Sequence, residues 1–217
     1  MGLGDGPREW DDYEWVKLSD VRASGRTGRD DRGRRIKPRA APAPPADIEA
    51  VKPYAEAMVN WFRRAPLWVE GAGTRVLLVD LDNLRAGPVR WAARMGGVLD
   101  LARSADHAAF AGQAGAVDRA RPWLAEFADR AVAVGGASDE ADWALLDAAA
   151  GLADDPVQFV VVSNDHIFAR LADRGLLTLL SPGAAALSGR LREAAYRVVD
   201  LVGLERDAEA ALPAPPA

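Results

Sequence analysis

The 217-residue sequence contains no cysteine and only two histidines, His107 and His166. The absence of cysteine excludes disulfides, thiolate metal sites and a cysteine nucleophile. A zinc site is not expected either, because zinc in proteins is held mainly by cysteine and histidine. A chain without cysteine fits a reducing compartment, and we expect the protein in the cytoplasm.

Long apolar segments are also missing. Residues 1–15, MGLGDGPREWDDYEW, are polar and acidic and lack the apolar core of a signal peptide. The longest apolar stretches are interrupted by charged residues or by Pro182 and Gly183, so we expect no transmembrane helix. The net charge of -5 gives the molecule as a whole no attraction to nucleic acids or anionic membranes. With 49% hydrophobic residues, the composition suits one domain of about 150 residues with extensions.

Residues 1–45 have few aliphatic side chains and end in the proline-rich stretch APAPP, which predicts a disordered arm. Residues 9–15 combine aromatic and acidic side chains, as in segments that become ordered on a protein partner; the alternative is that they fold back onto this chain's own domain. Residues 22–39 are rich in arginine. Two interpretations of them stay open: an arm that binds RNA with salt-sensitive affinity, and a solvated linker.

From Thr74 onward, short apolar runs alternate with helical stretches. The strand candidates are apolar at successive positions, which is typical of a parallel sheet buried on both faces. The pattern predicts an α/β protein, a three-layer α/β/α sandwich with a mainly parallel central sheet, over residues 74–204. A helical extension at 46–73 is expected before this domain and a tail at 205–217 after it. The expected strands are 75–80, 107–112, 130–134, 157–163 and 176–181, with a short last strand near 196–201, and the expected helices are 88–103, 117–129, 138–153, 165–174 and 186–196.

Acidic and amide side chains directly follow three of these strands. Ligands of parallel α/β sheets bind beyond the carboxyl ends of the strands, near the point where the strand order reverses. Each group of side chains also has a simpler interpretation, as a helix cap or a turn residue. Gathered carboxylates repel one another unless a cation joins them, and the expected cation is a hard divalent ion, Mg²⁺ or Mn²⁺. The candidates are Asp80, Asp82 and Asn83 after the first strand, Asp139, Glu140 and Asp142 after the third, and Ser163, Asn164 and Asp165 after the fourth.

Three segments together resemble a known family. VLLVDLDNL, DEADWALLDAA and VVVSNDHIFARLADRG are similar to the matching motifs of the NYN domain, a branch of the PIN-like ribonucleases, over about residues 75–200. The resemblance implies a PIN-like fold and a metal-dependent cleavage of RNA phosphodiester bonds. It also implies RNA as the partner, and we expect this RNA to be single-stranded.

The resemblance assigns roles to individual positions. It implies that Asp80 and Asp165 hold the metal ion directly and that Asp142 completes an acidic catalytic pocket. Asp82 fills a position that is often acidic in the family and is a further candidate ligand. Asn83 is expected to orient the first loop or touch a phosphate, and Ser163 and Asn164 to shape the loop after the fourth strand and contribute to substrate binding.

One position departs from the family pattern. Family members commonly carry another acid a few residues after the Ser-x-Asp element, where this sequence has Ile167. Asp82, Asp139 or Glu140 would have to supply the missing carboxylate. The departure keeps open an alternative function, in which a PIN-like domain binds RNA or a protein without cutting.

The motif DLDN at 80–83 also resembles the nucleophile motif of haloacid-dehalogenase-like phosphatases. That family needs a cation, usually a lysine, downstream of the motif. All three lysines, Lys17, Lys37 and Lys52, precede it, and Leu84 stands at the expected Thr or Val position. This phosphatase is therefore the less favoured enzyme. No P-loop lysine motif is present, which excludes that class of nucleotide hydrolase.

The arginines and tryptophans of the predicted helices each have two interpretations. Arg90 and Arg94 share one helical face, where they line a phosphate path or are ordinary exposed residues. Trp91, Trp123 and Trp143 have spacings compatible with burial, so core positions are favoured over base stacking.

Overall fold

The computed structural model describes residues 48–64, 67–137, 139–152 and 157–210. The predicted arm at residues 1–45, with its segments 9–15 and 22–39, lies outside the described residues. Within the described stretches, no helix combines the length and the apolar character that crossing a membrane requires.

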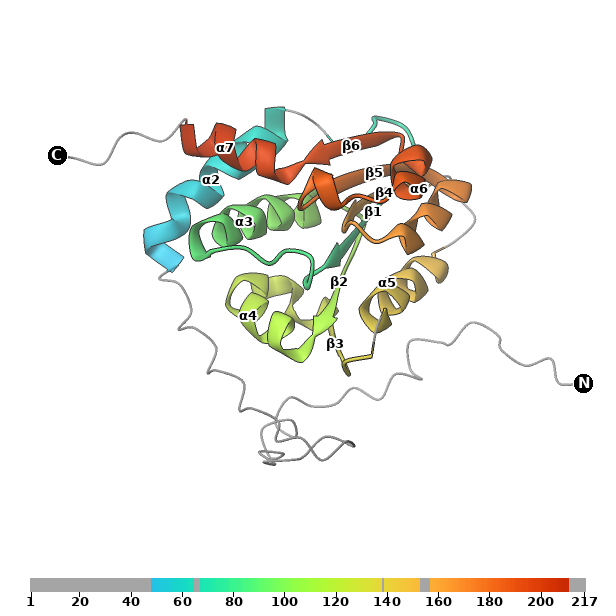
Figure 1. The fold of residues 1–217 in the computed structure, drawn as a ribbon, viewed down its shortest axis with the longest axis horizontal. Helices are drawn as coiled ribbons and strands as arrows, with labels where there is room; N and C mark the ends of the chain where they lie inside the picture. The colour runs from blue at the N-terminus through green and yellow to red at the C-terminus, as the bar shows by residue number, and fades with distance from the viewer. Residues whose placement is uncertain (1–47, 65–66, 138, 153–156, 211–217) are drawn as a thin grey trace, which may run out of the picture. The chain divides into compact units, whose positions relative to one another are not determined.

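Among the described residues, six strands form one sheet in which every neighbouring pair is parallel. The order across the sheet is β3-β2-β1-β4-β5-β6 (Figure 1). Helices cover both faces, so the predicted three-layer α/β/α sandwich is confirmed. The strands are β1 Thr74–Asp80, β2 His107–Gln113, β3 Ala131–Val134, β4 Val157–Val162, β5 Gly175–Ser181 and β6 Arg197–Asp200.

Helical segments connect the successive strands and also flank the sheet in the chain. Two predicted helices differ in kind from the expectation, because the segment after β4 is a 3-10 helix and the segment before β3 changes from an α-helix to a 3-10 helix at Ala125. The α-helices are α2 Ile48–Arg64, α3 Pro88–Ser104, α4 Ala114–Leu124, α5 Glu140–Ala150, α6 Gly189–Ala194 and α7 Leu201–Ala210, and the 3-10 helices are η2 Ala125–Arg130, η3 His166–Asp173 and η4 Ala184–Ala186.

The central strand β1 separates two hydrophobic clusters. Leu77 and Val79 pack in one cluster with α2, α3, α4 and α7, whereas Val76 and Leu78 pack in the other with α5, η3 and α6. Because successive side chains of a strand point to opposite faces, each cluster receives every second residue. Asp80 continues the series of Val76 and Leu78, so its side chain lies on the face that α5 covers.

The strand order reverses at the boundary between β1 and β4. β2 and β3 lie on one side of β1, and β4, β5 and β6 lie on the other. The register pairs Val79 with Val162, and it pairs Asp80 with Ala111. The residues that follow β1 and β4 therefore meet at the reversal point, where parallel α/β sheets bind their ligands.

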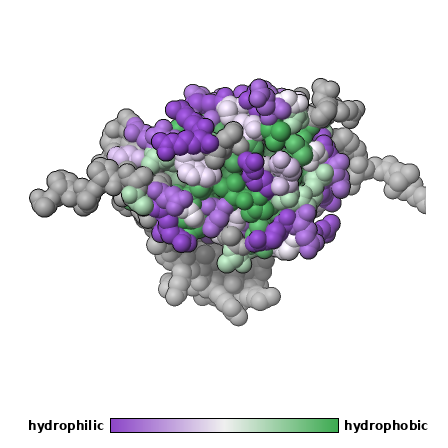
Figure 2. Space-filling view, turned by 90° about the horizontal axis from the view of Figure 1, so that it is seen from above, coloured by the Kyte–Doolittle hydropathy of each residue, from purple (hydrophilic) through white to green (hydrophobic). Residues whose placement is uncertain are grey.

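The edge strand β6 is short and only half covered. Val198 and Val199 are partly buried, one against each hydrophobic cluster. Seen from the β6 side, hydrophobic residues are visible between hydrophilic ones (Figure 2). A short edge strand limits pairing with other chains, because few backbone groups are left exposed.

Helix α2 approaches α3 closely at two glycines. A Cβ atom at Gly97 would lie 1.8 Å from the Phe62 ring, and one at Gly96 would lie 2.6 Å from the Ala55 Cβ atom. A larger residue at either position would force the helices apart. The described part of the predicted helical extension at 46–73, residues 48–64 and 67–73, thus contributes to the core that it shares with α3.

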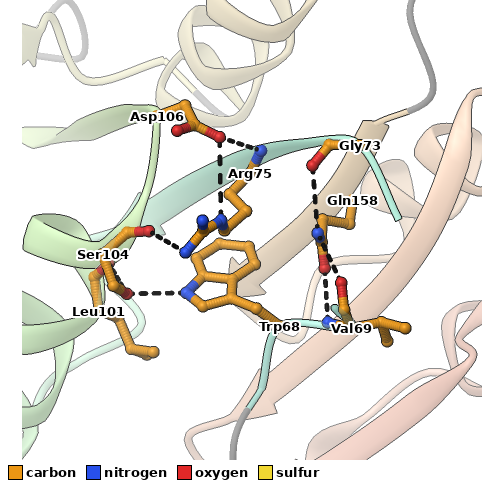
Figure 3. A network of polar contacts seen from close by, with 8 residues as sticks. All are labelled: Trp68, Val69, Gly73, Arg75, Leu101, Ser104, Asp106 and Gln158. Carbon is orange, nitrogen blue, oxygen red and sulfur yellow. Dashed lines mark hydrogen bonds and ion pairs between the residues drawn. The ribbon is translucent and has the colours of Figure 1, made fainter. Parts of the chain in front are cut away.

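A polar network fixes the segment between α2 and β1 at the amino edge of the sheet (Figure 3). The buried Gln158 amide accepts a hydrogen bond from the Val69 N–H (2.7 Å) and donates to the carbonyls of Val69 (3.1 Å) and Gly73 (3.3 Å). Trp68 Nε1 donates to Ser104 Oγ at 2.8 Å. These bonds attach the segment to β4 and α3, so the structure continues across the predicted boundary at residue 73.

Helix α7 is attached to α3 by a buried ion pair. Arg94 is 4% exposed and Glu205 1% exposed, and Arg94 donates to both carboxylate oxygens of Glu205. The Arg94 guanidinium also donates to the carbonyls of Arg85 and Pro182, each at 3.4 Å, in the loops after β1 and β5. Arg94 is therefore neither exposed nor free to bind a phosphate, which corrects both sequence interpretations of it. Glu205, assigned to a tail from the sequence, belongs to the core.

We predict that Glu205→Gln lowers the free energy of unfolding by about 3–5 kcal/mol, because it leaves the Arg94 charge buried without its carboxylate. Urea unfolding of the full chain measures this loss. Glu126→Gln is the matched control, since it removes the exposed ion pair with Arg103, 2.7 Å long, and should cost about 1 kcal/mol or less. Equal losses in the two variants would contradict a structural role for the buried pair.

Candidate functional site

Aspartates from three parts of the chain gather at the carboxyl edge, the edge of the sheet where all the strands end. Asp80 is the last residue of β1. Asp139 and Asp142 lie at the start of α5, and Asp165 precedes η3 after β4. The parallel sheet brings them together because β1 and β4 are neighbours and α5 begins at the same edge.

Asp80 is 3% exposed, and both of its carboxylate oxygens accept hydrogen bonds. Oδ1 accepts from the backbone N–H groups of Asp82 (3.0 Å) and Asn83 (3.2 Å). Oδ2 accepts from the Asn83 amide and from Ser163 Oγ (3.2 Å). Burial raises the pKa of Asp80, and these hydrogen bonds oppose the rise. Asp80 thus organises the loop after β1.

The Ser163 hydroxyl joins the loops after β1 and β4. It donates to Asp80 Oδ2 and accepts from the Asn83 amide (3.3 Å) and from the Asp165 backbone N–H (3.1 Å). Ser163 is fully buried. The hydroxyl that fixes the position of Asp165 therefore also orders the Asp80 loop.

Asp139, Asp142 and Asp165 form an acidic triad. One carboxylate oxygen from each lies within 4.8 Å of those from the other two. Asp139 is the N-cap of α5 and has a left-handed backbone, φ +66°, which aspartate adopts more readily than most residues. Asp165 is the N-cap of η3, where its Oδ1 accepts from the Ile167 N–H at 3.0 Å.

Asp142 is the electrostatically most strained member of the triad. It is 7% exposed, and its buried Oδ1 has no hydrogen-bond partner within the part of the chain that the structure describes. Burial, together with the negative charges of Asp80, Asp165, Asp139 and Asp82, raises the pKa of Asp142 to about 7. An unpartnered carboxylate oxygen in such a field is a favourable position for a cation.

The triad is able to hold a metal ion. Two oxygens on one hard divalent cation lie at most about 4–5 Å apart, since each metal–oxygen distance is about 2.0–2.6 Å. The oxygens of the triad lie within 4.8 Å of one another, near the upper end of this limit. The all-oxygen donor set suits a hard cation, and the chain has no cysteine to offer a softer one.

Asp82, a predicted ligand, lies outside the triad. Its Oδ1 pairs with Arg85 at 2.9 Å, and its Oδ2 accepts from the Gln113 N–H at 2.7 Å. Asp82 therefore ties the loop after β1 to the end of β2. It acts on the triad only through its charge, which contributes to the raised pKa of Asp142.

The residues predicted to contact the substrate make hydrogen bonds within the protein instead. Asn83 donates to Asp80 and Ser163, as described above. Asn164 donates to the Gly183 carbonyl (3.1 Å) and accepts from Ser181 Oγ (2.6 Å), which joins the loops after β4 and β5. These amides shape the rim of the site.

Of the residues considered for the missing carboxylate, only Asp139 joins the triad. Glu140 instead accepts a hydrogen bond from the Gly136 N–H at 3.0 Å. Ile167 stands where the family commonly has an acid, and it packs against the hydrophobic cluster that includes α5 and η3. The sequence named Asp139 as a candidate for the missing carboxylate, on its spacing of three residues from Asp142 at a helix start, but the family resemblance gave it no ligand role.

Comparisons with known proteins add no assignment. No family model matches the chain, and no curated protein or solved structure matches it.

We predict that Asp142→Asn stabilises the metal-free protein at high pH. A pKa raised from 3.8 to about 7 means that the folded state binds the proton more tightly than the unfolded state. The stabilisation from protonated Asp142 is complete below about pH 4 and is lost as the pH rises through 7. In a chelator at pH 8, the variant should melt at least about 2 °C above the wild type, and this gain should shrink at pH 5.

Thermal unfolding from pH 5 to pH 8 measures this difference. Asp118→Asn, at an exposed position on α4, is the control and should leave the pH dependence unchanged. A melting temperature of Asp142→Asn below the wild-type value at pH 8 would contradict the electrostatic account of the site.

Proposed function

We propose that this protein is a metal-dependent ribonuclease that hydrolyses RNA phosphodiester bonds with Mg²⁺ or Mn²⁺. The observation that carries the proposal is that Asp142, a member of the acidic triad, has a buried Oδ1 without a hydrogen-bond partner among the described residues. A group of carboxylates alone is common in proteins, but a buried oxygen without a donor is costly unless a cation binds it. The location of the triad at the reversal of strand order supports a catalytic role.

The resemblance to the NYN domain supports RNA as the substrate. The proposal differs from the family expectation in the ligand set. Asp139, Asp142 and Asp165 hold the ion, with Asp139 in place of the acid that Ile167 replaces. Asp80 fixes the loop and adds negative charge, because both of its oxygens already accept hydrogen bonds.

The residues of the chain divide the catalytic work. A bound divalent ion supplies Lewis acidity, which polarises a phosphate oxygen and lowers the pKa of a bound water. The triad would hold this ion where its positive charge offsets the negative charge that develops on the phosphate oxygens. Ser163 holds the Asp165 backbone in place, and His166 Nδ1 lies 3.1 Å from Asp165 Oδ1 on the exposed rim. No residue is required to form a covalent intermediate with the substrate.

A second candidate function is an RNA- or protein-binding module that does not cut. The observation that favours it is Ile167, a partly buried apolar residue that packs against the core where the family commonly has an acid. The haloacid-dehalogenase-like phosphatase receives less support, because its nucleophile would be Asp80, which is 3% exposed and fully hydrogen-bonded.

We predict that Mg²⁺ or Mn²⁺ raises the melting temperature of the wild type and leaves that of Asp142→Asn nearly unchanged. An ion at 100 times its dissociation constant stabilises the folded state by about 2.7 kcal/mol, which raises the melting temperature by about 5–10 °C. Thermal unfolding with increasing metal concentration measures the shift. Asp118→Asn should respond like the wild type, and an equal shift in Asp142→Asn would place the ion elsewhere.

We predict that the purified protein cleaves RNA only with a divalent ion, and that Asp142→Asn and Asp165→Asn each lower the rate by at least about 100-fold. Mutation of a residue that hydrogen-bonds to a metal ligand typically lowers metal affinity or activity about 10- to 100-fold. Mutation of a direct ligand should lower the rate more. Cleavage of an end-labelled single-stranded RNA, resolved on a gel, measures the rate. Full activity in both variants would exclude this mechanism, and metal-independent RNA binding without cleavage would favour the binding module.

A further inference from the structure

Trp143 occupies an unusual position for a tryptophan on a helix of this domain. It is 47% exposed on α5, whereas Trp91 on α3 is buried in the core and Trp123 on α4 is partly buried against it. The expectation that all three are core residues therefore fails for Trp143. Tryptophan is enriched at binding interfaces, so an exposed tryptophan is a candidate for contact with a partner.

Trp143 is a close neighbour of the acidic triad along the chain. Trp143 directly follows Asp142, so their Cα atoms are about 3.8 Å apart. Its backbone N–H donates to the Asp139 carbonyl at 3.0 Å, in the first turn of α5. The start of α5 thus carries Asp139, Asp142 and the exposed Trp143 within about one turn.

A cation from a second element accompanies the ring. The Arg170 guanidinium carbon lies 5.2 Å from the centre of the Trp143 ring, on the surface of η3. η3 begins at the N-cap Asp165, just as α5 begins at the N-cap Asp139. Each of the two helices therefore provides a triad acid at its start and one member of the Trp143–Arg170 pair further along.

An aromatic face and a guanidinium beside a phosphate-binding centre are the chemistry of single-strand recognition. Unpaired bases stack on aromatic side chains, and arginine contributes charge and cation–π attraction. The negative triad needs positive charge nearby, because RNA is a polyanion. Arg170 lies over the ring, yet close to half of the Trp143 surface stays exposed.

We propose that Trp143, supported by Arg170, is a stacking platform for an unpaired nucleobase next to the phosphate held at the acidic triad. The inference rests on RNA as the proposed substrate, and it makes single-stranded RNA the substrate class. The bases of a duplex are stacked on one another and offer no free face to the ring.

The test measures the affinity of the full-length protein for a fluorescein-labelled single-stranded RNA, by anisotropy in Ca²⁺ to hold cleavage low. Trp143→Ala should weaken binding about 5- to 150-fold, the range for loss of one stacked base, and Trp143→Phe should recover most of it. Tyr196→Ala is the matched control, because Tyr196 is an exposed aromatic residue at the opposite, amino edge of the sheet. Its affinity should equal that of the wild type.

Two further measurements make the result decisive. The melting temperature of each variant shows that it folds. An otherwise identical RNA with abasic positions should bind wild type and Trp143→Ala equally, since the stacked base is absent. Affinity of Trp143→Ala within twofold of wild type, an equal loss with abasic RNA, or no RNA binding by the wild type would each overturn the platform.

Cleavage by the same proteins keeps this test separate from that of the proposed function. Binding that depends on Trp143 without cleavage in any metal would refute the ribonuclease and uphold the platform. If cleavage requires Asp142, and Trp143→Ala binds and cuts the RNA as well as the wild type does, the ribonuclease is upheld and the stacking platform is refuted.

Discussion

Repulsion between carboxylates is the constraint around which the carboxyl edge of the sheet is arranged. The fold offsets it by giving most of these acids a protein partner. Asp80 accepts from Asn83 and Ser163, and Asp82 pairs with Arg85. Asp142 is left with a buried oxygen that the described residues do not satisfy. The acids thus divide into those that build the loops and a triad that could hold a cation.

The fold was predictable because its signal is local. Apolar residues at successive positions, as in β1 and β4, occur where helices cover both faces of a parallel sheet. The role of α7 was not predictable in the same way. From the sequence, Glu205 resembles an ordinary surface residue, and its partner Arg94 lies 111 residues earlier. A pairing over that separation depends on the tertiary structure. The 3-10 geometry of η3 was equally hidden, since a short apolar pattern fits a repeat of 3.0 or of 3.6 residues.

The location of the candidate site was predictable, but the use of each side chain was not. Residues that follow strands in a parallel sheet converge at one edge, so the aspartates after β1, β3 and β4 were the right residues to consider. The sequence shows which residues carry oxygens, whereas the structure shows which oxygens are already bonded. Asn164 is an example, since both ends of its amide are taken by the loop after β5. The exposed Trp143 was hidden for the same reason, because a helical spacing compatible with burial does not say which face is covered.

The guanidinium of Arg94 has a consequence for how the protein comes to be folded during synthesis. It contacts the loops after β1 and β5, yet the carboxylate that neutralises it arrives with α7, after every strand of the sheet has been made. Until then a nascent chain carries a positive charge that cannot be buried without its counter-ion. The loops beside the aspartates would settle only in the last stage of folding, so an incomplete chain would hold the sheet without a finished site.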